Sequence, residues 1–164
     1  MKTRVRPARL DDIPFVRALS VEMVVHGIPH TRRVDPQVVR ERARKSLAQL
    51  EMTLLDKDFR ILVADDEETA ERLGYIMLDL HSVESSTGDR QCLIHDVAVK
   101  REHWGRFVVH SLIRAAVELA AQRGMLYLVG EVTRSNERTL GTALKGLGFE
   151  VERHQIVKHV PPLG

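Results

Sequence analysis

The sequence predicts an α/β domain in which a mixed, mostly antiparallel sheet with one central parallel strand pair is flanked by helices. Two periodicities predict it, because segments with apolar residues every three or four positions alternate with short apolar runs that are typical of strands. A third observation predicts which two strands are parallel. A helical pattern from Val108 to Gly124 lies between two apolar runs, and such strand–helix–strand crossovers join parallel neighbours. With 164 residues, 43% of them hydrophobic, the chain is expected to form a single domain over residues 1–164.

The first half of the chain is predicted to hold one strand, two helices and a hairpin. Asp11 and Asp12 precede apolar residues at helical spacing, which indicates an N-capped helix that begins at Ile13. Pro29 ends that pattern, and Asp35 with the proline after it starts a second, amphipathic helix. The predicted ranges are a strand over 3–6, helices over 13–23 and 35–55, and paired strands over 59–64 and 73–80.

The second half is predicted to continue as strand, helix, strand, helix and strand. A polar connection over 84–89 precedes a third consecutive strand, so the middle of the chain is expected to form an antiparallel meander. The next helix ends at Gly124, because glycine commonly follows a helix end. The apolar run after it is expected to be a central strand. The predicted ranges are strands over 91–99, 125–132 and 149–160, and helices over 108–124 and 135–146.

Charge and cysteine content exclude several classes of function. The 25 Lys and Arg against 23 Asp and Glu give a net charge of +2, and such a balance indicates neither a nucleic-acid partner nor a membrane partner. No apolar run approaches the roughly 20 residues that span a bilayer, and no signal peptide is evident, so the cytoplasm is the expected compartment. The single cysteine, Cys92, is expected to be a small core residue. His26 and His30 are separated by Gly27 and Pro29, so no metal site is expected.

The segment after the third strand has the features of an anion site. A strand that ends near Val99 and a helix that opens near Val108 leave unpaired backbone N–H groups at the positive end of a helix dipole. Such a place is suited to a diphosphate. Arg101 and Arg106 add positive charge, and Gly105 lets the backbone approach phosphate oxygens closely.

Three motifs, in this order and on these elements, resemble the GCN5-related N-acetyltransferases over nearly the whole chain. They are the segment Asp96-Val97-Ala98-Val99-Lys100-Arg101-Glu102-His103-Trp104-Gly105-Arg106, the Asn136 that opens the last helix, and the ending Leu147-Gly148-Phe149. The resemblance implies direct transfer of an acetyl group from acetyl-CoA, the co-substrate, to a primary amine of a small molecule or peptide, by a protein of a family in which homodimers are common. It implies cofactor-binding roles for Val97, Ala98, Val99, Trp104, Gly105, Arg106, Phe107, Val108, Val109 and Asn136.

The sequence departs from the family pattern at three places. Phe107 and Val109 stand where the pyrophosphate loop usually has small residues, so only Gly105 of three remains. Leu144 stands where many members carry a tyrosine that protonates the departing thiolate, and Ser135 or an ordered water are the alternatives for that role. These departures leave a second interpretation, a catalytically inactive module of the same fold that binds a ligand or serves in an assembly. A third interpretation, acyl transfer to a protein terminus, uses the same site with a wider mouth.

The reaction also needs a base, because an amine with a pKa near 10.4 is protonated at neutral pH and must lose a proton before it attacks. The resemblance favours an acidic group between the parallel strands, hence Glu131 or Asp96 as the catalytic residue. Glu131 is predicted to lie within the apolar run 126–132, where a carboxylate is costly unless it is paired or functional. Asp96 alternates with apolar residues and equally fits a solvent-facing position. His95 and His81 are the further candidates.

Overall fold

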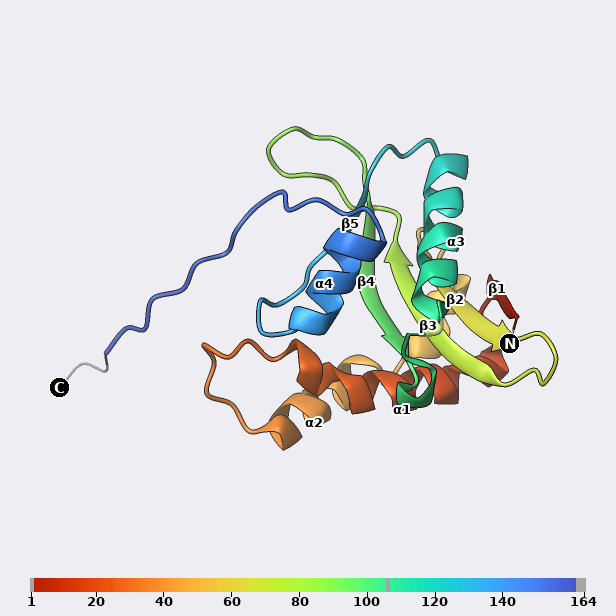
Figure 1. Ribbon diagram of the computed structural model, residues 1–164, viewed down its shortest axis with the longest axis horizontal. Helices are drawn as coiled ribbons and strands as arrows, with labels where there is room; N and C mark the ends of the chain where they lie inside the picture. The colour runs from red at the N-terminus through yellow and green to blue at the C-terminus, as the bar shows by residue number, and fades with distance from the viewer. Residues whose placement is uncertain (1, 106, 162–164) are drawn as a thin grey trace.

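The computed structural model describes residues 2–105 and 107–161, which form one mixed sheet with helices on both faces (Figure 1). The strands, in their order across the sheet, are β1 (Thr3–Pro7), β2 (Phe59–Asp66), β3 (Arg72–Asp79), β4 (Cys92–Val99) and β5 (Leu128–Gly130). The helices are α1 (Ile13–Met23), α2 (Pro36–Ser46), α3 (Val108–Gln122) and α4 (Glu137–Gly146). β1 to β4 are antiparallel neighbours and β4 pairs with β5 in parallel, which confirms the predicted fold class. No helix in the described part of the chain is both long enough and apolar enough to cross a bilayer.

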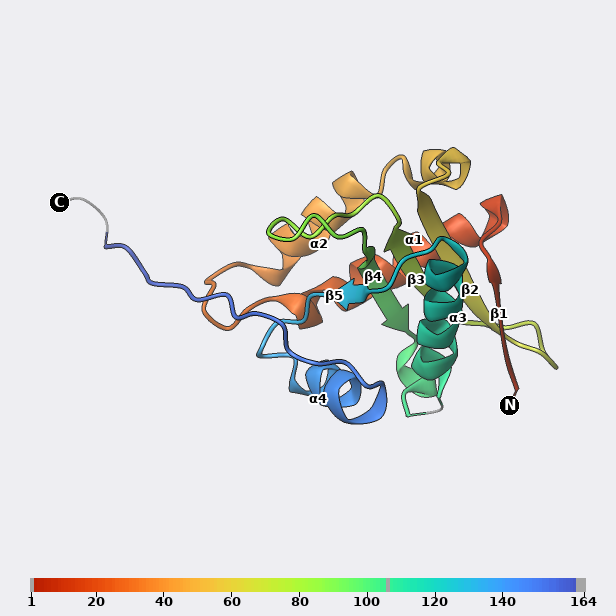
Figure 2. The same ribbon diagram turned by 90° about the horizontal axis from the view of Figure 1, so that it is seen from above.

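Two hydrophobic clusters hold the layers together, one on each face of the sheet (Figure 2). α3 packs on one face through residues that include the fully buried Leu112 and Ala116. α1 packs on the other through residues that include the fully buried Ile13 and Val16. The strands supply both clusters, because successive side chains of a strand point to opposite faces. Cys92 is buried on the α3 side, as expected, and burial raises the pKa of its thiol to about 11.

The second helix is shorter than the sequence predicts. α2 ends at Ser46, and a 3-10 segment, Leu50–Leu55, replaces the end of the predicted 35–55 helix. No residue of α2 is buried, whereas Leu47 and Leu50 after it are 8% and 4% exposed and pack in the same cluster as α1. Most helix stability in proteins comes from packing. The chain therefore turns where it can bury these leucines, and the apolar stripe of the predicted helix is not continued.

The last part of the chain differs most from the prediction. β5 keeps only three residues of the predicted 125–132 strand, and it lies at the edge of the sheet. The predicted strand over 149–160 does not form. Leu147 and Phe149 still pack against the α3-side cluster, and residues 150–161 continue as an extended tail in which Ile156 is 92% exposed (Figure 1). Polar and charged residues fill most of this segment, and strand propensity depends on a neighbouring strand and a surface to pack on.

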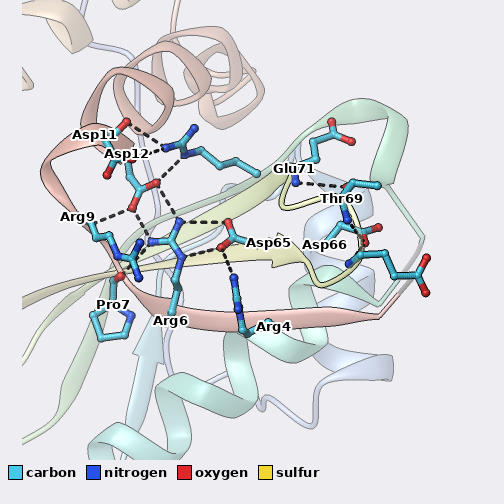
Figure 3. Close-up of polar contacts among 12 residues, drawn as sticks. Arg4, Arg6, Pro7, Arg9, Asp11, Asp12, Asp65, Asp66, Thr69 and Glu71 are labelled. Atoms are coloured by element: carbon cyan, nitrogen blue, oxygen red, sulfur yellow. Dashed lines mark hydrogen bonds and ion pairs between the residues drawn. The ribbon is translucent and has the colours of Figure 1, made fainter.

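A buried carboxylate joins the start of α1 to β1 and β3 (Figure 3). Asp12 is fully buried and accepts hydrogen bonds from Arg6 Nη1 and from Arg72 Nε, each at 2.6 Å. The backbone N–H of Arg9 donates to it at 2.8 Å. Arg6 also donates from Nε to Asp65 Oδ2 of β2 at 2.6 Å. Burial alone would raise the pKa of Asp12, but the guanidinium groups of Arg6 and Arg72 hold it well below its usual range.

Replacing Asp12 by asparagine is expected to lower the free energy of unfolding by about 3 kcal/mol at pH 7, because two guanidinium groups lose their buried counter-charge. Since the folded pKa of Asp12 is depressed, its stabilisation is complete above the unfolded pKa near 3.9 and is lost as pH falls toward the folded pKa. Urea denaturation at pH 7 and pH 3 measures both effects.

The control is Asp11→Asn, because the Asp11 side chain pairs with the same Arg72 but is 70% exposed. Exposed ion pairs contribute less than about 1 kcal/mol. Equal losses of stability in the two variants would contradict the structural role assigned to Asp12.

Candidate active site

β4 carries a bulge in the middle of the candidate site. Its pairing with β3 runs from Met77 opposite Asp96 to Leu78 opposite Ile94, so His95 is an extra residue on β4. A bulge of this kind changes which way the groups that follow it point, and bulges are common beside active sites. Its trace in the sequence is the pair of adjacent polar residues, His95 and Asp96, in an otherwise apolar segment.

Beyond the bulge, the backbone of β4 turns free groups toward β5. Lys100 N donates to Leu73 O of β3 at 2.9 Å. Because alternate residues of a strand bond to opposite neighbours, the N–H and C=O groups of Val97 and Val99 point away from β3. β5 pairs only with Cys92 to Ile94. Within the described residues no strand meets β4 further along, so Val97 and Val99 present backbone donors and acceptors where β4 and β5 separate.

Asp96 lies on the α1 side of the sheet, where two hydroxyl groups hold it. Ser20 Oγ of α1 donates to Asp96 Oδ2 at 2.7 Å, and Tyr75 OH of β3 donates to the same oxygen at 2.6 Å. Burial and the charge of Asp96 raise the pKa of Tyr75, so the phenol remains a donor. No described residue donates a hydrogen bond to Asp96 Oδ1. Asp96 is half-buried, and two hydroxyl groups fix one of its oxygens.

The sequence alone does not indicate Ser20 or Tyr75 as candidate site residues. Ser20 offers one signal, since it is a polar residue on the otherwise apolar buried face of α1. Tyr75 is fully buried in a strand, and a buried phenol usually has a hydrogen-bond partner.

The other candidate bases lie in different surroundings. Glu131 is exposed and follows the end of β5, so the prediction of a carboxylate within a buried strand is wrong. The run around it lies at the sheet edge, where Leu126 is 85% exposed and a solvated carboxylate costs little. His95 is exposed and packs edge to face on Phe59, with ring centroids 5.6 Å apart. His81 is exposed just beyond β3. Asp96, which is half-buried and accepts two hydrogen bonds, is therefore the better candidate for a base.

The loop after β4 keeps a left-handed backbone at two positions despite its bulky residues. Gly105 has φ of +78° and Phe107 has φ of +60°, and both lie in the region that favours glycine. The Phe107 ring is 71% exposed and lies edge to face on His110 of α3. No side chain among the described residues caps the start of α3, and the N–H groups of a helix's first turn are suited to an anionic ligand. Val108 and Val109 face the α3-side core, and Arg106 lies outside the described residues.

Trp104 folds back over the end of β4. Its indole Nε1 donates to Val99 O at 2.8 Å. The guanidinium carbon of Arg138, in the first turn of α4, lies 4.3 Å from the indole centroid, and that of Arg101 lies 5.8 Å away. His26, which follows α1, meets the indole edge on, with ring centroids 5.8 Å apart. One side chain thus joins the end of β4, the segment after α1 and the start of α4.

The start of α4 uses its polar side chains within the protein. Asn136 Oδ1 accepts from Thr139 N at 3.3 Å and caps the helix. Ser135 Oγ donates to Ile28 O at 3.1 Å, which commits its hydroxyl proton to a structural contact. Leu144, further along α4, is 38% exposed and has no proton to donate. The structure therefore favours neither Ser135 nor Leu144 as an acid.

The chain is similar to known proteins in both sequence and fold. The profile described as "Acetyltransferase (GNAT) family" matches residues 28–149. A Pyrococcus furiosus protein assigned as an acetyl transferase superposes with a TM-score of 0.76 at 18% identity, over 97% of this chain and 100% of that one. An aminoglycoside N-acetyltransferase in complex with a bisubstrate analogue of CoA superposes with a TM-score of 0.73 at 15% identity, over 98% and 99%.

A third similar structure is a GCN5-related N-acetyltransferase from Ralstonia eutropha, with a TM-score of 0.70, 18% identity and 97% and 99% coverage. No curated protein sequence matches the chain. At these identities the structural likeness shows a common fold, and the profile match shows the sequence relationship.

Phe107 provides a direct test of the loop backbone. A non-glycine residue in the left-handed region costs roughly 1–2 kcal/mol, and glycine relieves that cost at some expense in chain entropy. We expect the free energy of unfolding of Phe107→Gly, measured by urea denaturation, to be about 1 kcal/mol higher than that of Phe107→Ala. Both substitutions remove the ring, so the difference isolates the backbone. An alanine variant as stable as the glycine variant would show that position 107 does not hold a positive φ.

Proposed function

Because the chain belongs to the GNAT acetyltransferase family, we propose that it transfers the acetyl group of acetyl-CoA directly to a primary amine of a small molecule or peptide. The observation that carries the proposal is the bulge in β4. The carboxylate of Asp96 lies next to the part of the strand edge that β5 leaves unpaired. The N–H and C=O groups of Val97 and the N–H group of Val99 face that edge, and Val99 O accepts the indole N–H of Trp104. Acetyl-CoA supplies the acyl group as a reactive thioester. The residues of the chain bind the amine and the acyl donor and take up a proton.

Asp96 is proposed to bind the acceptor amine and to take its proton. Ser20 and Tyr75 fix Oδ2, so Oδ1 accepts a hydrogen bond from the ammonium group, an arrangement strengthened by the opposite charges. Asp96 Oδ1 first takes one proton from the ammonium group, which frees the lone pair of the nitrogen. The nitrogen then attacks the thioester carbon, the C–S bond breaks, and the nitrogen loses its second proton to water as the amide forms. Fixing the carboxylate in one orientation lowers the entropy cost of reaching that geometry.

Val97 and Val99 are proposed to hold the acyl donor along β4. A pantetheine arm carries amide groups, which pair with free N–H and C=O groups of an extended strand much as another strand would. A backbone N–H also stabilises the negative charge that develops on the thioester oxygen, and it requires no particular side chain. The first turn of α3 offers donors to the diphosphate. Further contacts are proposed for Ala98, Trp104, Gly105, Arg106, Phe107, Val108, Val109 and Asn136.

Departure of the thiol is proposed to need no side-chain acid. An ordinary thiol has a pKa of about 8.5, so a thiolate leaves readily near neutral pH and can take its proton from water. This chemistry tolerates Leu144 in place of a tyrosine and leaves Ser135 to its contact with Ile28.

Calorimetry with acetyl-CoA, followed by a thiol assay of CoA release over a broad panel of primary amines, tests the proposal. We expect acetyl-CoA to bind and CoA release to depend on an amine. Tight binding with no release for any amine would support the alternative, a catalytically inactive ligand-binding or assembly module. No binding at millimolar acetyl-CoA would overturn the proposed co-substrate.

Asp96→Asn is expected to lower kcat by roughly 10²- to 10⁴-fold, because general base catalysis is lost. The affinity for acetyl-CoA should stay within a factor of about two, since that ligand meets the backbone of β4. Steady-state kinetics and calorimetry measure the two effects. Glu131→Gln is the control, as it makes the same kind of change on an exposed carboxylate and should leave kcat unaltered. A larger loss in Glu131→Gln than in Asp96→Asn would reverse the assignment.

Tyr75→Phe is expected to lower kcat about tenfold and to lower the free energy of unfolding by about 1.5–3 kcal/mol, because one hydrogen bond to a carboxylate is removed from a ring that stays buried. Ser20→Ala should act similarly, and Ser20→Thr, which retains a hydroxyl, should recover much of the rate. Kinetics paired with urea denaturation separates positioning from stability. If kcat is unaltered in both Tyr75→Phe and Ser20→Ala, the hydrogen bonds that orient Asp96 do not contribute to catalysis.

A further inference from the structure

The side chain of Trp104 already bonds to Val99 O, a backbone acceptor that the proposed acyl-donor site needs. Val99 O is the last acceptor on the edge of β4 that faces β5, and the indole N–H of Trp104 already donates to it at 2.8 Å. A pantetheine amide that bonds to the same carbonyl has to replace this N–H. The chain is therefore in a conformation in which its own side chain takes the place of the ligand.

Arg138 lies over the indole ring of Trp104 and holds it in this position. Its guanidinium carbon lies 4.3 Å from the ring centroid, a distance typical of a cation–π contact. Arg138 belongs to α4 and Trp104 to the loop after β4, so the contact spans the place where β4 and β5 separate. No carboxylate in the described part of the chain forms an ion pair with Arg138, whereas Arg101 has Glu22 at 3.6 Å. Arg138 thus has an aromatic face for a partner and no counter-ion.

We propose that Arg138 is a phosphate-binding residue that selects phosphate-bearing acyl donors, and that it exchanges the ring of Trp104 for a phosphate group when acetyl-CoA binds. This inference rests on the proposed function and adds to it a residue that the sequence did not indicate. A guanidinium group binds phosphate through paired charge-assisted hydrogen bonds, which are stronger than an exposed cation–π contact. The phosphate thereby releases the indole, and Val99 O becomes free for the pantetheine arm.

Two substitutions separate the two parts of this exchange. Trp104→Phe removes the N–H that bonds Val99 O but retains an aromatic face. It raises the fraction of protein molecules in which Val99 O is free. Such a change raises the affinity for every acyl donor by the same factor. We expect acetyl-CoA and S-acetylpantetheine, which lacks the nucleotide phosphates, both to bind about fivefold more tightly, since one hydrogen bond is worth roughly that factor.

Arg138→Gln acts on the two donors in opposite directions. It loosens the indole, so S-acetylpantetheine binds about two- to fivefold more tightly, and it removes a phosphate contact, so acetyl-CoA binds about tenfold more weakly. Arg134→Gln is the matched control, because it removes an equal charge from the loop just before α4 at an exposed residue that makes no cation–π contact with Trp104. It should alter the affinity of either donor by less than about twofold. Calorimetry without an amine acceptor measures all of these affinities.

Trp104 is the only tryptophan of the chain, so its fluorescence reports the exchange directly. We expect the emission of the wild-type protein to change on addition of CoA, with a midpoint equal to the dissociation constant from calorimetry. Emission that stays constant at saturating CoA would overturn the inference, and so would equal effects of Arg138→Gln and Arg134→Gln.

Failure of the proposed function looks different. If acetyl-CoA binds neither the wild-type protein nor Trp104→Phe, both the proposed function and the exchange are overturned. Binding by Trp104→Phe alone would support the exchange and show that the indole closes the site.

Discussion

One extra residue in β4 decides what the candidate site can do. Before the bulge, Cys92 and Ile94 direct their backbone groups toward β5 and their side chains toward α3. In a regular strand Asp96 would continue that series, with its carboxylate pointing into the apolar layer under α3. Because His95 is inserted, Val97 and Val99 take those positions and Asp96 lies on the other face, within reach of α1. A single shift of register thus places a carboxylate and an unpaired strand edge side by side.

The position of α1 matters for the same reason, and a second carboxylate governs it. Asp12 precedes α1 and binds guanidinium groups from β1 and β3, while Ser20, two turns further along the helix, reaches Asp96. The two carboxylates differ in what they have left to offer. The oxygens of Asp12 are occupied by cations and a backbone N–H, so it is a structural group. Asp96 receives two neutral hydroxyls on one oxygen and keeps the other, which suits a group that must accept a proton.

How far the sequence predicts the structure depends on where the decisive neighbours lie. Helices that bury an apolar face, such as Ile13–Met23, and the parallel pair of β4 and β5 follow from periodicity and crossover geometry. The bulge is hard to recognise, because it interrupts the alternation only at the adjacent polar residues His95 and Asp96 and both faces of β4 carry apolar residues. The left-handed backbone at Phe107 is invisible for a related reason, since that conformation is expected of glycine. The tail over 149–160 and the exposure of Glu131 depend on whether a neighbouring strand covers β5, and no local pattern records that. Among candidate site residues, Asp96, Val97 and Val99 lie on one segment of β4, and Trp104 bonds to Val99 O. The contacts of Ser20, Tyr75 and Arg138 join residues far apart in the chain, so no local pattern indicates them.

Amide hydrogen exchange along β4 tests the central claim most directly, which is that the strand edge freed by the bulge binds the acyl donor. Val97 and Val99 N–H groups have no strand partner, whereas the N–H of Ala98 between them pairs with β3. Saturating acetyl-CoA is predicted to slow exchange at Val97 and Val99 and to leave Ala98 nearly unaltered, giving an alternating pattern over three residues. Exchange at Val97 and Val99 that is the same with and without bound acetyl-CoA would contradict the account.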